Sequence, residues 1–379
     1  RAARQGHAQA QFNLAVLYMN GQGMRRKPAL AAKWYRSAAR QGHLRGQYNL
    51  AVLYQTGSGV SANLEEAAGW YARAAEHGMA DAQFALAQLY QTGLGDGAGD
   101  GGAKSSESLE LYTEAARQGH ARAQLALGRW YDGLRPGQRD AENNNKNYAL
   151  EWYRRAAESG LAAAQSRLGA LYAEGKTVPL SDREAALWFG RAAAQGDVTA
   201  QYHLGLFYEE GRGMAPDLGL AAEWYQVAAA AGHAEAQNNL GLLYDKGHGV
   251  TKDPVAARTW FLRAAEQENV NSQYNLAVFL DTGRGGEKDL AGAADWYQKA
   301  ARNGHGGAQY NWGVMLTEGD GAARDLVAAR VWAALASAPE NPDDVRAHAV
   351  GLTDALTPLM SADQIAEAAA RVQSWQSRD

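Results

Sequence analysis

Residues 234–269 read AEAQNNLGLLYDKGHGVTKDPVAARTWFLRAAEQEN, and this stretch decides the fold. Apolar residues recur in its first half at positions i, i+4, i+7 and i+8, namely Ala236, Leu240, Leu243 and Tyr244. This spacing is typical of one face of a helix. Gly247 and Gly249 follow, and glycine ends helices because it adopts the left-handed conformation at little cost.

The second half of the stretch predicts another helix. Asp253 is a favourable N-cap residue, and Pro254 suits the first helical position. Trp260 and Phe261 then continue an apolar face with small residues around them. Each helix has a bare apolar stripe that only a neighbour can cover, so we expect a helical hairpin that is stable only in an array.

Gln237 marks a position that recurs along the whole chain at spacings of 36 or 41 residues. The nine members are Gln11, Gln47, Gln83, Gln124, Gln165, Gln201, Gln237, Gln273 and Gln309. A period of this length is the signature of a repeat array. We therefore predict an all-α solenoid of about nine helical hairpins over residues 1–338. The two longer units carry glycine-, asparagine- and aspartate-rich insertions, Gly93–Gly102 and Leu134–Asn147, which we interpret as hairpin loops.

An aromatic pair recurs in the second helix of the units, as in Trp224-Tyr225 and Trp296-Tyr297. Its helical spacing favours core packing between repeats over an aromatic ligand box. The pattern decays after Ser337. Ser361 and Gln364 form a capping box, so we interpret residues 339–379 as helices that cap the end of the solenoid.

Composition narrows the function. The 379 residues are 46% hydrophobic with a net charge of −4, which does not favour nucleic acid as a partner. No cysteine is present, and no apolar run is long enough to span a membrane. Because Arg1 to His7 match the end of a unit, we expect the N-terminus to be truncated, which leaves periplasm and cytoplasm both open.

The pattern Ala-Gln-x-x-Leu-Gly-x-x-Tyr, then Gly-x-Gly-Val, then Ala-x-x-Trp-Tyr-x-x-Ala-Ala-x-x-Gly resembles the bacterial-type Sel1-like repeat family, which is related to tetratricopeptide repeats. The resemblance covers residues 1–338 and implies a right-handed α/α superhelix that serves as a scaffold or adaptor. It implies roles in bacterial signalling, cell-envelope assembly or exopolysaccharide export. The β-lactam-binding subgroup with disulfides is not implied, because cysteine is absent.

If the units stack as in tetratricopeptide proteins, the first helices line a concave groove. The residue after the recurrent glutamine then points into it, and six of nine are aromatic: Phe12, Tyr48, Phe84, Tyr202, Tyr274 and Tyr310. Exposed aromatic rings are frequent interface anchors. Packing on neighbouring first helices explains them equally well, and we keep both interpretations.

The next position carries asparagine five times, at Asn13, Asn49, Asn239, Asn275 and Asn311. Asparagine is unfavourable inside helices, so its recurrence needs a reason. The amides either satisfy loop carbonyls of the adjacent unit or bond the backbone of an extended peptide. Charges on this face also separate, with Arg122, Arg129 and Arg167 in the middle and acidic residues later: Glu209, Glu210, Asp245, Asp281 and Glu318. This separation either orients a ligand or is a solvated surface.

No catalytic or metal-binding motif is present in the sequence. The run Gly97-x-Gly99-x-x-Gly102 follows no predicted strand, and the recurrent histidines, one per unit, are interpreted as linker residues. We therefore predict a non-enzymatic scaffold, without cofactor or metal, that binds a peptide or protein segment in its groove. An envelope polysaccharide-binding or export scaffold is the alternative, and a hydrolase with an unrecognised site is the third hypothesis.

Overall fold

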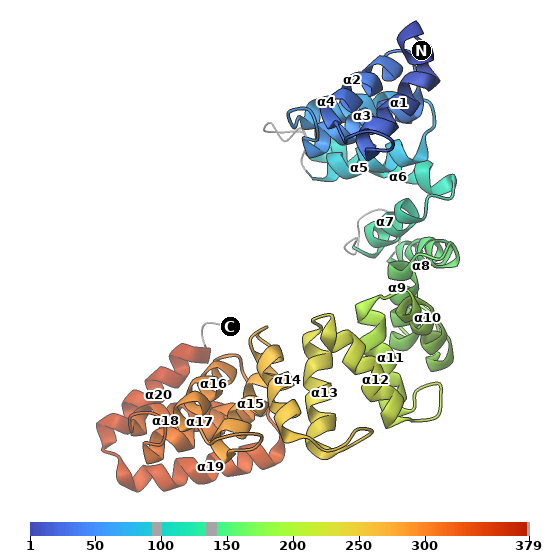
Figure 1. The fold of residues 1–379 in the computed structure, drawn as a ribbon. Helices are drawn as coiled ribbons and strands as arrows, with labels where there is room; N and C mark the ends of the chain where they lie inside the picture. Colours follow the sequence, from blue (N-terminus) through green and yellow to red (C-terminus); the bar gives the residue numbers. More distant parts are fainter. Residues whose placement is uncertain (93–100, 134–141, 377–379) are drawn as a thin grey trace. The chain divides into compact units, whose positions relative to one another are not determined.

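The structure is a computed structural model that describes residues 1–92, 101–133 and 142–376, with the side chains of 101–105, 142–144 and 376 excepted. The described residues are all helical, in agreement with the predicted α solenoid (Figure 1). They form two compact units, Arg1–Ser181 and Asp182–Asp379. We call these the N-terminal unit and the C-terminal unit.

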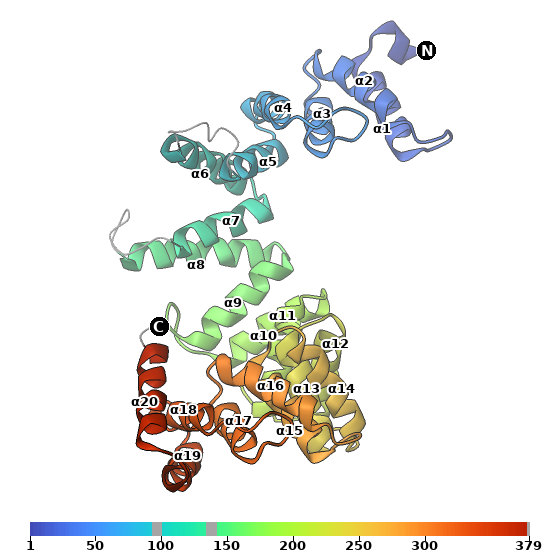
Figure 2. The same cartoon turned by 90° about the vertical axis from the view of Figure 1, so that its left-hand side faces the viewer.

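Each repeat contributes a first and a second helix. The first helices are α1 (Ala8–Asn20), α3 (Leu44–Thr56), α5 (Ala80–Gln91), α7 (Ala121–Asp132), α9 (Ala162–Glu174), α11 (Val198–Glu210), α13 (Ala234–Lys246), α15 (Val270–Thr282) and α17 (Gly306–Glu318). The second helices are α2 (Pro28–Ala39), α4 (Leu64–Glu76), α6 (Gly101–Arg117), α8 (Glu142–Glu158), α10 (Asp182–Ala194), α12 (Leu218–Ala230), α14 (Pro254–Ala265), α16 (Leu290–Arg302) and α18 (Leu326–Ala336). Within each unit consecutive helices pack on one another in chain order (Figures 1 and 2).

The predicted loop boundaries need correction where helices begin earlier than expected. Helix α8 begins at Glu142 and α6 at Gly101, so the ends of both predicted insertions are helical. The remainder of those insertions, 93–100 and 134–141, lies outside the described residues. Helix formation is favoured there because the following residues carry the apolar face that packs on the preceding first helix.

Two glycines show why the hairpin needs residues without a side chain. Gly241 faces the ring of Phe261 so closely that a Cβ would lie 2.7 Å from it. Gly249 has φ 70°, and a Cβ there would lie 2.1 Å from the carbonyl oxygen of Leu218 in the preceding repeat. The hairpin and its contact with the previous hairpin therefore both depend on glycine.

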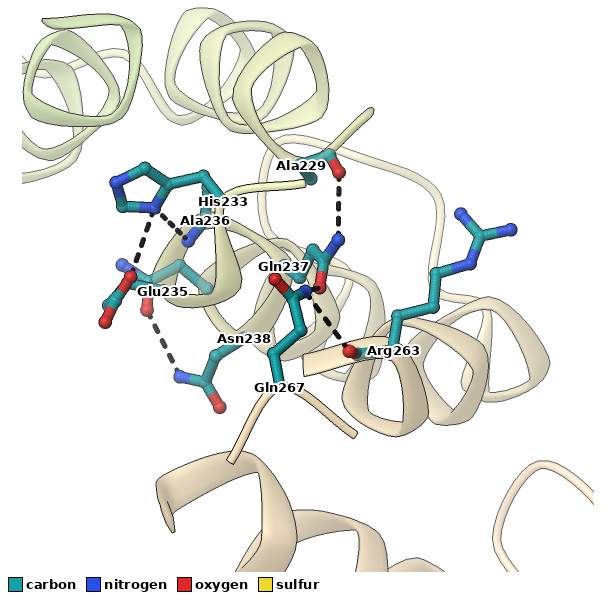
Figure 3. Close-up of polar contacts among 9 residues, drawn as sticks. Ala229, His233, Glu235, Ala236, Gln237, Asn238, Arg263 and Gln267 are labelled. Carbon is teal, nitrogen blue, oxygen red and sulfur yellow. Dashed lines mark hydrogen bonds and ion pairs between the residues drawn. The ribbon is translucent and has the colours of Figure 1, made fainter. Parts of the chain in front are cut away.

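The recurrent glutamine joins each repeat to the residues before it. In all nine members the buried side-chain amide donates to the main-chain carbonyl of the residue eight positions earlier. For Gln237 the acceptor is Ala229 at the end of α12, at 3.0 Å, and Gln267 donates to the glutamine Oε1 at 2.8 Å (Figure 3). A buried carbonyl at a helix end is costly unless it accepts a hydrogen bond, and the glutamine satisfies it.

The aromatic pair of the second helix packs mainly as predicted. Its second member is fully buried, as Tyr71, Tyr153, Phe189, Tyr225, Phe261 and Tyr297 show. The tryptophan beside it is more exposed in several repeats and carries a cation on its ring, as where Arg263 lies 4.6 Å from the Trp260 ring centroid. The pair thus supplies core on one side and a cation–π contact on the other.

The C-terminal helices α19 (Asp343–Leu356) and α20 (Ala362–Gln376) pack on α18, and α19 also contacts α17. The Ser361 main-chain N–H donates to Gln364 Oε1, and the Gln364 N–H donates to Ser361 Oγ, so the predicted capping box is present. The separation of residues 339–379 from the solenoid as a distinct cap stays an interpretation. No helix among the described residues is long and apolar enough to cross a bilayer.

Candidate functional site

The predicted groove residues all belong to the first helices of the repeats, and we call the surface that they form the first-helix face. It carries the six aromatic residues Phe12, Tyr48, Phe84, Tyr202, Tyr274 and Tyr310 and the five asparagines one position later. All six rings are partly exposed. They do not stand free, because each packs against another aromatic ring or a histidine of the chain.

In four repeats the ring packs on the histidine that begins the next first helix. The ring centroids are 4.6 Å apart for Phe12 and His43, 4.7 Å for Phe84 and His120, 4.5 Å for Tyr202 and His233, and 4.3 Å for Tyr274 and His305. Packing on the neighbouring first helix is therefore observed, while each of these aromatic residues stays partly exposed. The contact with the histidine restricts the orientation of each aromatic ring in the unbound chain.

The histidines are N-caps, which corrects their interpretation as linker residues. The Nδ1 atom of His305 accepts the main-chain N–H of Ala308 at 3.1 Å, and His43, His120 and His233 do the same three residues ahead. Sequence reasoning missed this role, although the histidine stands directly before each helix, because histidine is not among the usual cap residues. Burial lowers the pKa of His305, so the ring is neutral and able to accept.

Most asparagines of the face bond groups within the chain. Asn239 Oδ1 accepts from Asn238 Nδ2 at 3.2 Å. Burial raises the pKa of Tyr35, Tyr274 and Tyr297, and the nearby amides of Asn49 and Asn311 oppose that rise. Asn275 Nδ2 donates to Asn238 Oδ1 at 3.0 Å, and Asn13, which is exposed, accepts from Gln9 at 2.9 Å. Of these bonds only that of Asn275 reaches the preceding repeat, and it ends on a side-chain amide and not on a loop carbonyl. Contact with a peptide stays a prediction.

The acidic residues of the C-terminal unit are engaged by its own donors. Tyr225 donates its hydroxyl to Glu209 Oε2 at 2.5 Å, and Arg284 forms an ion pair with Asp245. Lys288 lies 3.9 Å from Asp281. Burial is the main cause that raises the pKa of Tyr225, and the bond to Glu209 adds to it.

The three arginines predicted to form a basic zone in the N-terminal unit differ in whether they form ion pairs. Arg167 lies 2.7 Å from Asp132 Oδ2 and 3.4 Å from Glu174, so its charge is paired. Arg122 and Arg129 on α7 are exposed, and neither forms an ion pair with a described residue. The predicted basic zone is therefore carried by two arginines and not by three.

A cavity of about 500 Å³ lies beside these two arginines. It is lined by α5, α7, one tyrosine of α6 and the start of α9, through Phe84, Gln88, Gln91, Tyr112, Arg122, Leu125, Ala126, Arg129, Trp130, Leu161 and Ala163. A second cavity of about 520 Å³ lies between α4, α5 and α6 and contains Glu76, Glu107, Glu110 and Glu114. No cluster of three or more potential metal ligands occurs among the described residues.

The chain is similar to known repeat proteins in sequence and in structure. The Sel1 repeat model matches nine segments, residues 8–43, 44–79, 80–120, 121–161, 162–197, 198–233, 234–269, 270–305 and 307–338. A solved structure of a protective antigen present in uropathogenic Escherichia coli strains, displaying an SLR fold, is 30% identical with a TM-score of 0.64, and the match covers 99% of this chain and 85% of the antigen. A Sel1 repeat protein from Oxalobacter formigenes is 31% identical with a TM-score of 0.60, over 81% of this chain and 86% of that protein. No curated protein matches the chain.

Proposed function

The chain belongs to the Sel1 repeat family, and we propose that it is a non-enzymatic scaffold that binds a peptide or protein segment on its first-helix face. Sel1 repeat proteins generally mediate protein–protein interactions and are typically non-catalytic. The proposal for this chain places the contacts at Phe12, Tyr48, Phe84, Tyr202, Tyr274 and Tyr310 and at the asparagines beside them. We further propose a role in bacterial signalling or cell-envelope assembly, which the resemblance to the family implies.

One observation carries the proposal: most of these aromatic residues pack on another ring of the chain and are still partly exposed. An aromatic ring that is already ordered loses little side-chain entropy when a partner covers it. Such rings are the residues that supply most of the free energy in protein interfaces. Because they recur at the same position in six of the nine repeats, they suit an extended partner better than a compact small molecule.

The test is a capture experiment from a bacterial lysate with the whole chain as bait, followed by mass spectrometry. We expect at least one protein to be captured by the wild-type chain and reduced about tenfold or more with the Tyr202→Ala/Tyr274→Ala/Tyr310→Ala variant. The matched control is Val227→Ala/Val255→Ala/Leu262→Ala, which removes exposed apolar side chains from the second helices of the C-terminal unit. Equal capture by the wild type and the tyrosine variant, both with native helicity, would remove the tyrosines of the C-terminal unit from the binding site.

A further inference from the structure

The cavity beside α7 arises where the repeat pattern changes at three positions at once. Leu125 stands where six other repeats have an aromatic ring, and Ala126 stands where five have asparagine. Leu161 stands at the position that holds a capping histidine at His43, His120, His233 and His305. All three residues line the cavity of about 500 Å³. Smaller side chains at these positions leave the space that the ring and histidine occupy between α15 and α17. Its size lies within the range of about 300–1,000 Å³ found for ligand sites.

The wall of this cavity offers more hydrogen-bond donors than acceptors. Arg122 and Arg129 donate only, and the Trp130 indole N–H is buried without an acceptor among the described residues. The Gln91 Oε1 acceptor is already used, because the Tyr112 hydroxyl donates to it at 3.0 Å. No carboxylate is found among the described residues that line the cavity. A ligand that complements this wall must bring acceptors and negative charge.

Three arginines at other positions of the repeats are paired with carboxylates, unlike Arg122 and Arg129. Arg167 is paired with Asp132, Arg212 with Asp182 and Arg284 with Asp245. Arg122 and Arg129 lie seven residues apart on α7, which places them on the same side of that helix as Leu125. Two unpaired cations and the apolar surfaces of Phe84 and Trp130 thus line a single cavity.

We propose that this cavity binds an acidic peptide segment, in which an aspartate or glutamate side chain is bound by Arg122 and Arg129 and a neighbouring large apolar side chain packs on Phe84 and Trp130. The inference rests on the proposed scaffold function and names the chemistry of the partner. A carboxylate suits the arginines because charge-assisted hydrogen bonds to guanidinium are strong and directional. The chain's net charge of −4 does not favour a nucleic acid at this place.

The experiment uses the whole chain and a synthetic peptide array with three classes of member. Each member has an aromatic residue beside Asp or Glu, beside Asn or Gln, or beside Lys. We expect the wild-type chain to bind the acidic class at least tenfold more tightly than the amide class, since charge-assisted bonds are being compared with neutral ones. This preference should weaken as the salt concentration rises.

Three variants locate the site. Arg122→Ala/Arg129→Ala should lose the acidic preference by tenfold or more. Leu125→Phe/Leu161→His restores the ring and histidine of the other repeats, keeps both arginines, and should also lose binding because the cavity is filled. Arg117→Ala/Arg154→Ala removes the same charge from exposed positions on α6 and α8 and should bind within twofold of the wild type.

The outcomes separate this inference from the scaffold proposal. Peptide binding that ignores acidic residues, or that survives both cavity variants, overturns the inference and leaves the scaffold proposal standing. Binding of no peptide class by the wild-type chain overturns both. Binding of an oligothymidylate probe that depends on the two arginines, in place of peptide, overturns the assignment of the partner as a peptide.

Discussion

The contact between α7 and α9 and the contact between α15 and α17 use the same positions of the repeat with opposite results. Between α15 and α17, Tyr274 stacks on His305, and the histidine caps the next helix. Between α7 and α9, Leu125 and Leu161 stand at these positions, α9 has no side-chain cap, and a cavity with two unpaired arginines lies alongside. One repeat pair fills its face with its own side chains, and the other leaves a place for a ligand.

The largest expected effect on stability comes from replacing the ring and histidine between α15 and α17 by the leucines found between α7 and α9. Tyr274→Leu/His305→Leu removes the ring stack and the N-cap bond, and each is worth about 1 kcal/mol. We expect the free energy of unfolding to fall by about 2 kcal/mol, measured by urea denaturation. A decrease in the free energy of unfolding below about 0.5 kcal/mol would show that the ring stack and the histidine cap do not stabilise the chain.

Introducing the ring and histidine between α7 and α9 should raise the stability of the chain, by less than the loss expected above. Leu125→Phe/Leu161→His fills the cavity and supplies the missing cap, so stability should rise by about 1 kcal/mol. The gain is smaller than the loss above because the existing side chains have relaxed around the leucines. Thermal unfolding checks it, with Leu125→Phe alone as the control for cavity filling without a cap. A fall in the melting temperature would mean that the two contacts differ in backbone spacing as well.

Low pH should weaken the contact between α15 and α17, which contains His305, and should not affect the contact between α7 and α9, where Leu161 stands at the same position. The folded pKa of His305 is lowered by burial, so the unfolded chain binds more protons as the pH falls below about 6.5. The stabilisation is therefore present above that pH and is lost as pH falls through the folded pKa. His305→Asn retains a cap, as Asn269 does for α15, and should flatten the decline of Tm between pH 7.5 and 5. Replacing the exposed His248 by Asn should leave the decline unchanged.

The smallest effects concern the charges. Arg122→Ala/Arg129→Ala breaks no ion pair among the described residues, so the free energy of unfolding should change by less than about 0.5 kcal/mol. Asp245→Ala leaves Arg284 without its ion-pair partner and should cost up to about 1 kcal/mol, since the pair is partly exposed. Differential scanning calorimetry of both variants would test the contrast, and a larger loss for the arginine variant would contradict it.

The sequence alone predicted the hairpin, the period and the core position of the aromatic pair, because these depend on spacing within one repeat. It could not predict the cavity, since that volume depends on Leu125 and Leu161, which lie 36 positions apart in the sequence and meet only in three dimensions. The histidine caps were missed for a related reason. His305 becomes useful as a cap where Tyr274 buries its ring, 31 positions earlier in the chain.

Charge was the least predictable property of the face. Arg167 was grouped with Arg122 and Arg129 by sign and position, yet its guanidinium meets Asp132, a residue from the previous repeat. A charge in a repeat array acts on a partner only if the adjacent repeat does not neutralise it, and this requires knowledge of both side-chain conformations.

The recurrent glutamine has a consequence for the history of the chain. Each copy of the unit carries the donor for the joint behind it and, at the end of its second helix, the carbonyl for the joint ahead. A duplicated repeat therefore contains both the glutamine donor and the carbonyl acceptor that it needs to bond to its neighbours. Such a chain grows or shortens by whole units without new joints having to evolve, and a single copy that drifts, as at Leu125 and Leu161, becomes specialised while its neighbours keep the array in register.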